Sequence, residues 1–172
     1  MKKELTRRSF LKLAGVGTLA VAMSGSLTGC DVIDNLKDMD SVSAAIGDVK
    51  FMLSASVWSN GAGGQENDVS YQPTCEIRNN SKKAVTYGGS GSEVIITGVL
   101  TDKNGKEYPM TYAGENGSAP AGEKYEVKDF KLVAVGKELY MEGSKVVTTF
   151  TYNGRKAVFT EYYDGNITSK VE

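Results

Sequence analysis

Apolar and polar residues alternate along most of the chain after residue 45, with the period of two that is typical of β-strands. The alternation is clear over residues 49–57 and nearly perfect over 69–78, where Val69, Tyr71, Cys75 and Ile77 share one face. Pro73 falls on that same face and has no backbone N–H. It therefore predicts that this strand lies at a sheet edge or turns that position outward.

Further strands are predicted along the rest of the chain, separated by residues typical of turns. Residues 94–100 are apolar on both faces, which indicates a central strand, and the alternation shifts near Asp129, which indicates a bulge. No segment has the period of a convincing helix. The remaining strands are expected at 84–87, 108–112, 124–133, 146–152 and 155–162, with a last short one after Asp164-Gly165.

Two turns have a specific chemistry. At 102–106, a type I turn with Gly105 left-handed places Asp102 opposite Lys106, whereas a two-residue turn would bring like charges together. The first arrangement is favoured by about 0.2–1 kcal/mol for each pair. Asn153-Gly154 has the preferred sequence for a two-residue hairpin turn.

Seven to nine short strands separated by turns predict an all-β fold, a β-sandwich. The segments Cys75-Glu76-Ile77-Arg78-Asn79-Asn80-Ser81 and Leu100-Thr101-Asp102-Lys103-Asn104-Gly105-Lys106, followed by Pro120-Ala121-Gly122-Glu123 and an aromatic-rich strand, resemble the immunoglobulin-like domains of small bacterial lipoproteins. The most similar type is telokin-like and of unassigned function. The resemblance covers about residues 45–165 and implies an immunoglobulin-like β-sandwich. It supplies no catalytic residues.

The N-terminus has the three parts of a signal peptide: basic residues, a short apolar stretch and a small-residue end. The apolar stretch at 13–23 is about half the length needed to span a bilayer. Thr6-Arg7-Arg8-Ser9-Phe10-Leu11-Lys12 resembles the twin-arginine class of export signals at every specified position. The resemblance implies export of an already folded protein, with Arg7, Arg8, Phe10 and Leu11 as signal residues.

Leu27-Thr28-Gly29-Cys30 resembles the bacterial lipobox, in which the cysteine is lipidated and becomes the first residue after cleavage. Two or three acyl chains would anchor the protein stably to a membrane. We therefore expect a signal peptide at 1–29, a tether at 30–45 and the β-domain at 46–172. The location implied is the extracytoplasmic face of the bacterial cell membrane.

Charge and composition exclude several classes of function. The whole chain has 20 basic and 21 acidic residues, and removal of 1–29 takes away five basic residues and one acidic residue, which leaves a net charge near −5. That charge argues against a nucleic-acid partner. The chain has no histidine, and Cys75 is the only cysteine besides Cys30. The absence of histidine excludes histidine-based catalysis, and with Cys30 lipidated the single remaining cysteine excludes an internal disulfide and clusters of cysteine ligands, so we expect no cofactor and no metal.

The sequence indicates where the protein is located more closely than what it does. The candidate binding residues are Trp58, Tyr162 and Tyr163, and the exposed loops at 60–68, 88–92 and 114–122 are the expected contact surfaces. Exposed aromatic side chains near loops suit contacts with a protein or a glycan. We expect a lipid-anchored binding or accessory protein that is not an enzyme, with a buried structural Cys75. Two alternatives remain: a glycan-acting enzyme that uses carboxylates such as Glu123 and Glu126, and a purely structural envelope lipoprotein.

Overall fold

The computed structural model describes residues 41–60, 68–135 and 141–172, and at residues 55 and 58–60 it describes the backbone alone. The regular structure of these ranges consists of strands, without a helix. The strands are β1 (Val42–Ile46), β2 (Val49–Asn60), β3 (Asp68–Asn79), β4 (Val85–Gly88), β5 (Val94–Thr101), β6 (Glu107–Tyr112), β7 (Gly117–Ala119), β8 (Lys124–Val127), β9 (Leu132–Val135), β10 (Lys145–Tyr152), β11 (Arg155–Tyr162) and β12 (Ile167–Val171).

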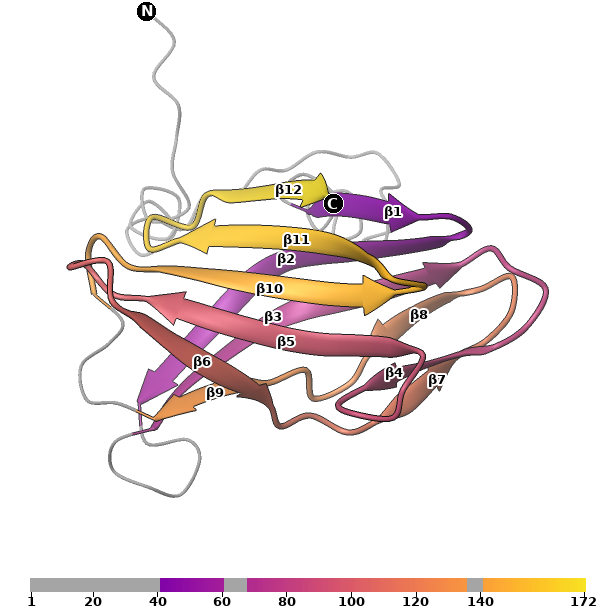
Figure 1. The fold of residues 1–172 in the computed structure, drawn as a ribbon, viewed down its shortest axis with the longest axis horizontal. Coiled ribbons are helices and arrows are strands. Elements are labelled where there is room, and N and C mark those ends of the chain that lie inside the picture. Colours follow the sequence, from indigo (N-terminus) through magenta and orange to yellow (C-terminus); the bar gives the residue numbers. More distant parts are fainter. Residues whose placement is uncertain (1–40, 61–67, 136–140) are drawn as a thin grey trace, which may run out of the picture. The chain divides into compact units, whose positions relative to one another are not determined.

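These strands form one continuous sheet, so the prediction of an all-β domain is confirmed. The main path runs β1-β2-β3-β9-β6-β5-β10-β11-β12, with β4, β7 and β8 attached beside it. Neighbouring strands are antiparallel except for the parallel pair β4 and β5. The sheet curls until β1 and β12 lie side by side, where the Ser169 hydroxyl donates to the Ser43 carbonyl at 2.9 Å (Figure 1). The result is nearly barrel-like, with twelve strands in the described ranges rather than the seven to nine expected.

The extra strands arise where the alternation was interrupted. β1 lies across the boundary predicted between tether and domain, and β7 lies within the predicted loop at 114–122. The strand predicted at 124–133 is two strands, β8 and β9, separated by a turn in which Asp129 is left-handed, with φ 51°. Both strands run antiparallel to β3, and the register changes from Cys75↔Val127 to Tyr71↔Leu132, so the interruption at Asp129 inserts one extra residue opposite β3, as the expected bulge would.

Pro73 occupies a local gap in the sheet. β3 pairs with β2 along one side, and along the other side with β8 at 75–78 and with β9 at 68–71. Residues 72–74 have no partner strand on that second side. β3 is thus an interior strand, so the first of the two alternatives, an edge strand, is wrong, and Pro73 lies instead at an interruption of the ladder.

Both predicted turns are confirmed. The Asp102 N–H donates to the Lys106 carbonyl at 3.0 Å, and Gly105 has φ 83°. At the other hairpin, Tyr152 pairs with Arg155, and both turn residues, Asn153 and Gly154, have positive φ values of 49° and 75°. These are the left-handed conformations that a type I′ turn requires.

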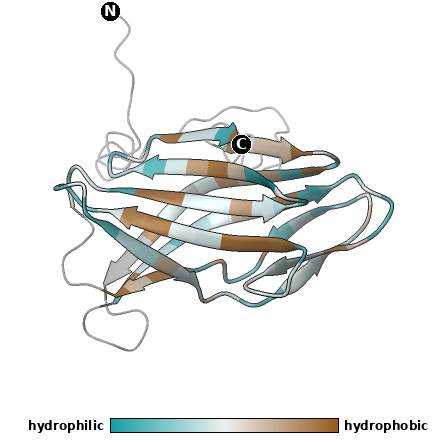
Figure 2. Ribbon diagram, viewed as in Figure 1, coloured by the Kyte–Doolittle hydropathy of each residue, from teal (hydrophilic) through white to brown (hydrophobic). Residues whose placement is uncertain are grey.

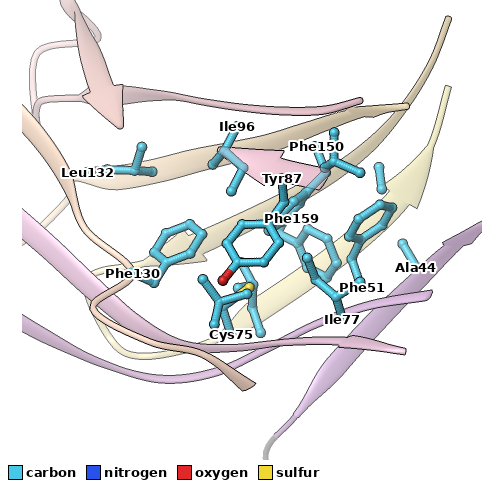
Figure 3. Close-up of a cluster of buried hydrophobic side chains, with 14 of the residues drawn as sticks. Ala44, Phe51, Cys75, Ile77, Tyr87, Ile96, Phe130, Leu132, Phe150 and Phe159 are labelled. Atoms are coloured by element: carbon cyan, nitrogen blue, oxygen red, sulfur yellow. The ribbon is translucent and has the colours of Figure 1, made fainter. Parts of the chain in front are cut away.

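Aromatic and aliphatic side chains fill the interior between facing walls of the sheet (Figure 3). Phe51 on β2 stacks on Phe150 of β10, with ring centroids 4.7 Å apart and an interplanar angle of 17°. Phe159 meets the edge of Phe150 at 5.6 Å, and Phe130 lies 6.1 Å from it. Such contacts add about 0.5–1.5 kcal/mol per pair to the hydrophobic effect. Phe150 is therefore the central contact of the core.

Candidate interaction surfaces

The three aromatic residues of the predicted binding surface have different surroundings. Tyr162, at the end of β11, is 43% exposed and lies opposite Lys145. Tyr163 is half-buried, and its N–H donates to the Ser144 carbonyl at 3.0 Å. Trp58 lies opposite Tyr71 in the β2–β3 ladder, and its side chain is outside the described part of the structure. Of the two side chains that are described, that of Tyr162 is the exposed one.

Two of the predicted contact loops, 88–92 and 114–122, are joined to each other. The Asn116 side-chain oxygen accepts the Gly89 N–H at 2.9 Å, and β4 pairs with β7 directly beside this link. Gly88 has φ 144°, and a Cβ atom there would lie 1.9 Å from the Asn116 oxygen. Glycine at 88 thus permits the close approach. We call residues 88–92 and 113–117 the linked loops.

The linked loops have a composition suited to recognition. Ser90, Gly91 and Asn116 are exposed, and no charged residue lies between 88 and 92. Serine, glycine and asparagine supply adaptable hydrogen bonding in binding loops. The third predicted loop, at 60–68, lies largely outside the described residues. The ends of β2 and β3 that flank it lie at the opposite end of the sheet from β4 and β7 (Figure 1).

A buried carboxylate inside the domain was missed by the sequence analysis. Glu161 on β11 is 5% exposed, and its carboxylate accepts hydrogen bonds from the hydroxyls of Tyr71, at 2.7 Å, and Ser56. The donors belong to β3 and β2, on the opposite wall. The side chain of Thr148 is also buried here, and its hydroxyl has no hydrogen-bond partner of standard geometry. We call Ser56, Tyr71, Thr148 and Glu161 the interior polar cluster.

A β-bulge gives Ser56 its inward direction. The β2–β3 register shifts between Ser54 and Ser56, so that Leu53 pairs with Cys75 and Ser56 pairs with Pro73. Since Cys75 and Pro73 both lie on the inward face of β3, the extra residue at 55 turns Ser56 toward the interior. Without the bulge, Ser56 would continue the outward row of Met52 and Ser54.

The interior polar cluster connects the two walls through the hydrogen bonds that Glu161 accepts. Burial, followed by the charge of Glu161 and the hydrogen bond to it, raises the pKa of the Tyr71 hydroxyl well above its usual range. A tyrosine nucleophile would need the opposite shift and an exposed hydroxyl, but Tyr71 is 1% exposed. A hydrogen bond to a charged group contributes about 1.5–3 kcal/mol to stability.

Of the other carboxylates, Asp68 at the start of β3 is also buried, at 6% exposed, and its Oδ1 has no hydrogen-bond partner among the described residues, whereas Glu123, Glu126 and Asp102 lie at the surface. Glu123 and Glu126 are both exposed, and Glu126 lies opposite Glu76, which pairs with Lys124 at 2.8 Å. The Asp102 carboxylate accepts the backbone N–H groups of Asn104 and Lys106, at 2.8 and 3.0 Å. Partial desolvation acts to raise the pKa of Asp102, but these hydrogen bonds outweigh it and lower the pKa. In the ranges that the structure describes, no three histidine, cysteine or acidic residues group as metal ligands would.

Cys75 is fully buried on the inward face of β3, in agreement with a structural role. Burial, and to a smaller extent the charge of Glu76, raises the pKa of its thiol well above the usual range. Since the thiolate is the reactive form, both effects make Cys75 unreactive in the folded protein.

We predict that the domain loses stability in alkali through Cys75 and Tyr71. Both groups have raised pKa values when folded, so their contribution is fully present below their ordinary pKa values, near 8.5 and 10, and is lost as the pH rises above them. The slope is about 1.4 kcal/mol per pH unit for each fully titrating group. Urea unfolding between pH 7.5 and 10.5 measures it, in a full-length Cys30→Ala background.

Cys75→Val should flatten the first part of this decline, between about pH 8.5 and 10. Thr74→Val, at the neighbouring exposed position, removes no titrating group and is the matched control. Equal alkaline slopes for Cys75→Val and the control would contradict the assignment.

Comparison with known proteins adds little to this description. No protein-family model and no curated protein matches the chain. Among solved structures, the chain is similar to the yjhA protein from Bacillus subtilis, with a TM-score of 0.36 and 15% sequence identity, over 62% of this chain and 76% of that one. Likeness at this level supports no conclusion about fold or function. No helix within the described residues has the length and apolar character needed to cross a membrane.

Proposed function

We propose that this protein is a lipid-anchored extracytoplasmic binding or accessory protein without catalytic activity, which binds a protein partner through the linked loops. The export signal with Arg7 and Arg8 and the lipobox ending at Cys30 support the location. The observation that carries the binding role is the hydrogen bond from the Gly89 N–H to the Asn116 side chain, because it holds two exposed loops in one arrangement. A loop that is already ordered loses less conformational entropy when it binds.

The fold that we propose for this role is an immunoglobulin-like β-sandwich with additional strands. Its support is the pair of facing walls with an aromatic core between them, together with the sequence segments that resemble such domains. This scaffold suits binding because its rigid strands present loops at their ends. The alternatives are a glycan-acting enzyme and a purely structural envelope lipoprotein.

The test is crosslinking capture of partners from native membranes that contain the full-length chain. The wild-type protein should capture one stoichiometric partner. Asn116→Ala removes the side-chain hydrogen bond to the Gly89 N–H but keeps the β4–β7 pairing, and we expect this to cost binding about 1–2 kcal/mol and to reduce capture about 5–30-fold. Asn80→Ala, at another exposed turn, is the matched control and should capture as the wild type does.

The outcomes separate the three functions. Absence of any partner together with glycan binding would favour the glycan-acting alternative, and absence of both would favour the structural one. Equal capture by Asn116→Ala would show that the linked loops are not the contact. Cys30→Ala tests the anchor in the same membranes, since that chain should no longer partition into the detergent phase.

A further inference from the structure

A broad outward face of the sheet carries almost no charge. On β5, β10 and β11 the central outward positions hold threonine and β-branched aliphatic residues, flanked near the strand ends by Lys145, Lys156 and Tyr162, and Val158 among them is only 7% exposed. We call the threonine and aliphatic residues the threonine–valine face: Ile95, Thr97, Val99, Thr101, Val147, Thr149, Thr151, Val158 and Thr160. Figure 2 looks onto these strands, where strongly hydrophilic colours are largely confined to the strand ends and turns. The outward face of β2 and β3 instead carries Lys50, Glu76 and Arg78.

The register of the strands arranges this face in rows across the sheet. One row is Pro109–Val99–Val147–Thr160, and the next contains Thr97–Thr149–Val158. A third row, at the end of β5, is Glu107–Thr101–Lys145–Tyr162. Charges of opposite sign thus stand in the same row, two strands apart, on either side of β5.

From this arrangement we propose that the threonine–valine face binds a second copy of the same chain. Let two copies stack face to face about a two-fold axis that runs parallel to the strands, between β5 and β10. Val99 of one copy then lies over Val147 of the second copy, and Thr97 lies over Thr149. In both pairs, residues of the same type meet across the interface, and no two charges of the same sign are in contact. A two-fold interface needs this self-complementarity, because the same surface patch contacts itself.

The charged row supports the same axis. The axis places Lys145 of one copy over Thr101 of the second copy. Glu107 of the second copy lies one strand away from that Thr101, so Lys145 can pair with it. The two-fold symmetry creates this Lys145–Glu107 pair twice. Neighbouring strands are about 4.8 Å apart, within reach of a lysine side chain. Opposite charges at the rim of an uncharged centre match the usual anatomy of protein interfaces.

The area is sufficient for a weak dimer. Four strands at about 4.8 Å spacing and eight residues at about 3.3 Å rise give a face of about 500 Å², so two copies bury about 1,000 Å². That is the low end for specific pairs, and we expect a dissociation constant in the micromolar range. The linked loops adjoin this face where Gly88 pairs with Ile95, but they share no residue with it, so variants at Thr97, Glu107 and Lys145 leave the loops unchanged.

Sedimentation equilibrium of the full-length chain in detergent tests the dimer. The wild type should show a reversible monomer–dimer equilibrium, and Thr97→Lys should raise the dissociation constant at least about tenfold, because it sets a charge in the uncharged centre. The matched control is Thr74→Lys, the same change at an exposed position on β3 of the other wall, which should dimerise as the wild type does. A monomer at every concentration, or a dimer unaffected by Thr97→Lys, would overturn the proposal.

A charge exchange tests the geometry independently of folding. Lys145→Glu and Glu107→Lys should each weaken the dimer several-fold, and the double variant should return the dissociation constant to within about threefold of the wild type. Failure of the double variant to recover would overturn the proposed axis. Thermal unfolding of each variant verifies that it is folded, and the outcome is independent of partner capture by the linked loops.

Discussion

Replacement of Phe150 by alanine is expected to destabilise the domain by about 3–5 kcal/mol, a large part of the stability of a domain of this size. Phe150 is fully buried and contacts Phe51, Phe130 and Phe159 from three other parts of the chain. Removal of the ring leaves a cavity that these three rings cannot close without leaving their own contacts. Equilibrium urea unfolding of the full-length protein measures the loss.

The control for this variant is Thr149→Ala, at the adjacent outward position of β10. It changes the same strand without opening a cavity, so its cost should stay below about 1 kcal/mol. A loss below about 1 kcal/mol for Phe150→Ala would mean that Phe150 is not the central contact of the core.

The sequence predicted most strands because local pattern and local turn chemistry agree at those places. The hairpins at 102–106 and 153–154 are examples, since glycine and asparagine there admit the left-handed conformation that each turn needs. β7 was missed because a three-residue strand has too few positions to show alternation. β8 and β9 were joined into one strand because the break at Asp129 does not use glycine or proline.

The interior polar cluster could not be found from the sequence for a different reason. Val158 and Phe159 are both apolar, so the pattern of β11 does not reveal which face is inward, and Glu161 has the appearance of a surface charge. Its donors are 105 and 90 residues away along the chain. One donor, Ser56, faces inward only because of the bulge at 54–56, which a pattern of strict alternation does not predict.

Tyr71→Phe is expected to cost about 1.5–3 kcal/mol of unfolding free energy. The substitution keeps the buried ring but removes the hydroxyl that donates to Glu161 at 2.7 Å, so a buried carboxylate oxygen loses a hydrogen bond. The matched control is Tyr152→Phe. Tyr152 is also buried, at 8% exposed, and its hydroxyl has no hydrogen bond to any residue of the described ranges, so the cost there should be below about 0.5 kcal/mol.

A double-mutant cycle with Glu161→Gln shows whether the two residues act on each other. The neutral amide presents one acceptor and one donor group, so the Tyr71 hydroxyl gains less from it than from the carboxylate. A coupling energy of about 1–2 kcal/mol is expected between the two changes. Additive losses would mean that Glu161 and Tyr71 stabilise their own walls separately. Coupled losses would mean that their hydrogen bond joins β3 to β11 and helps to hold the curled sheet closed.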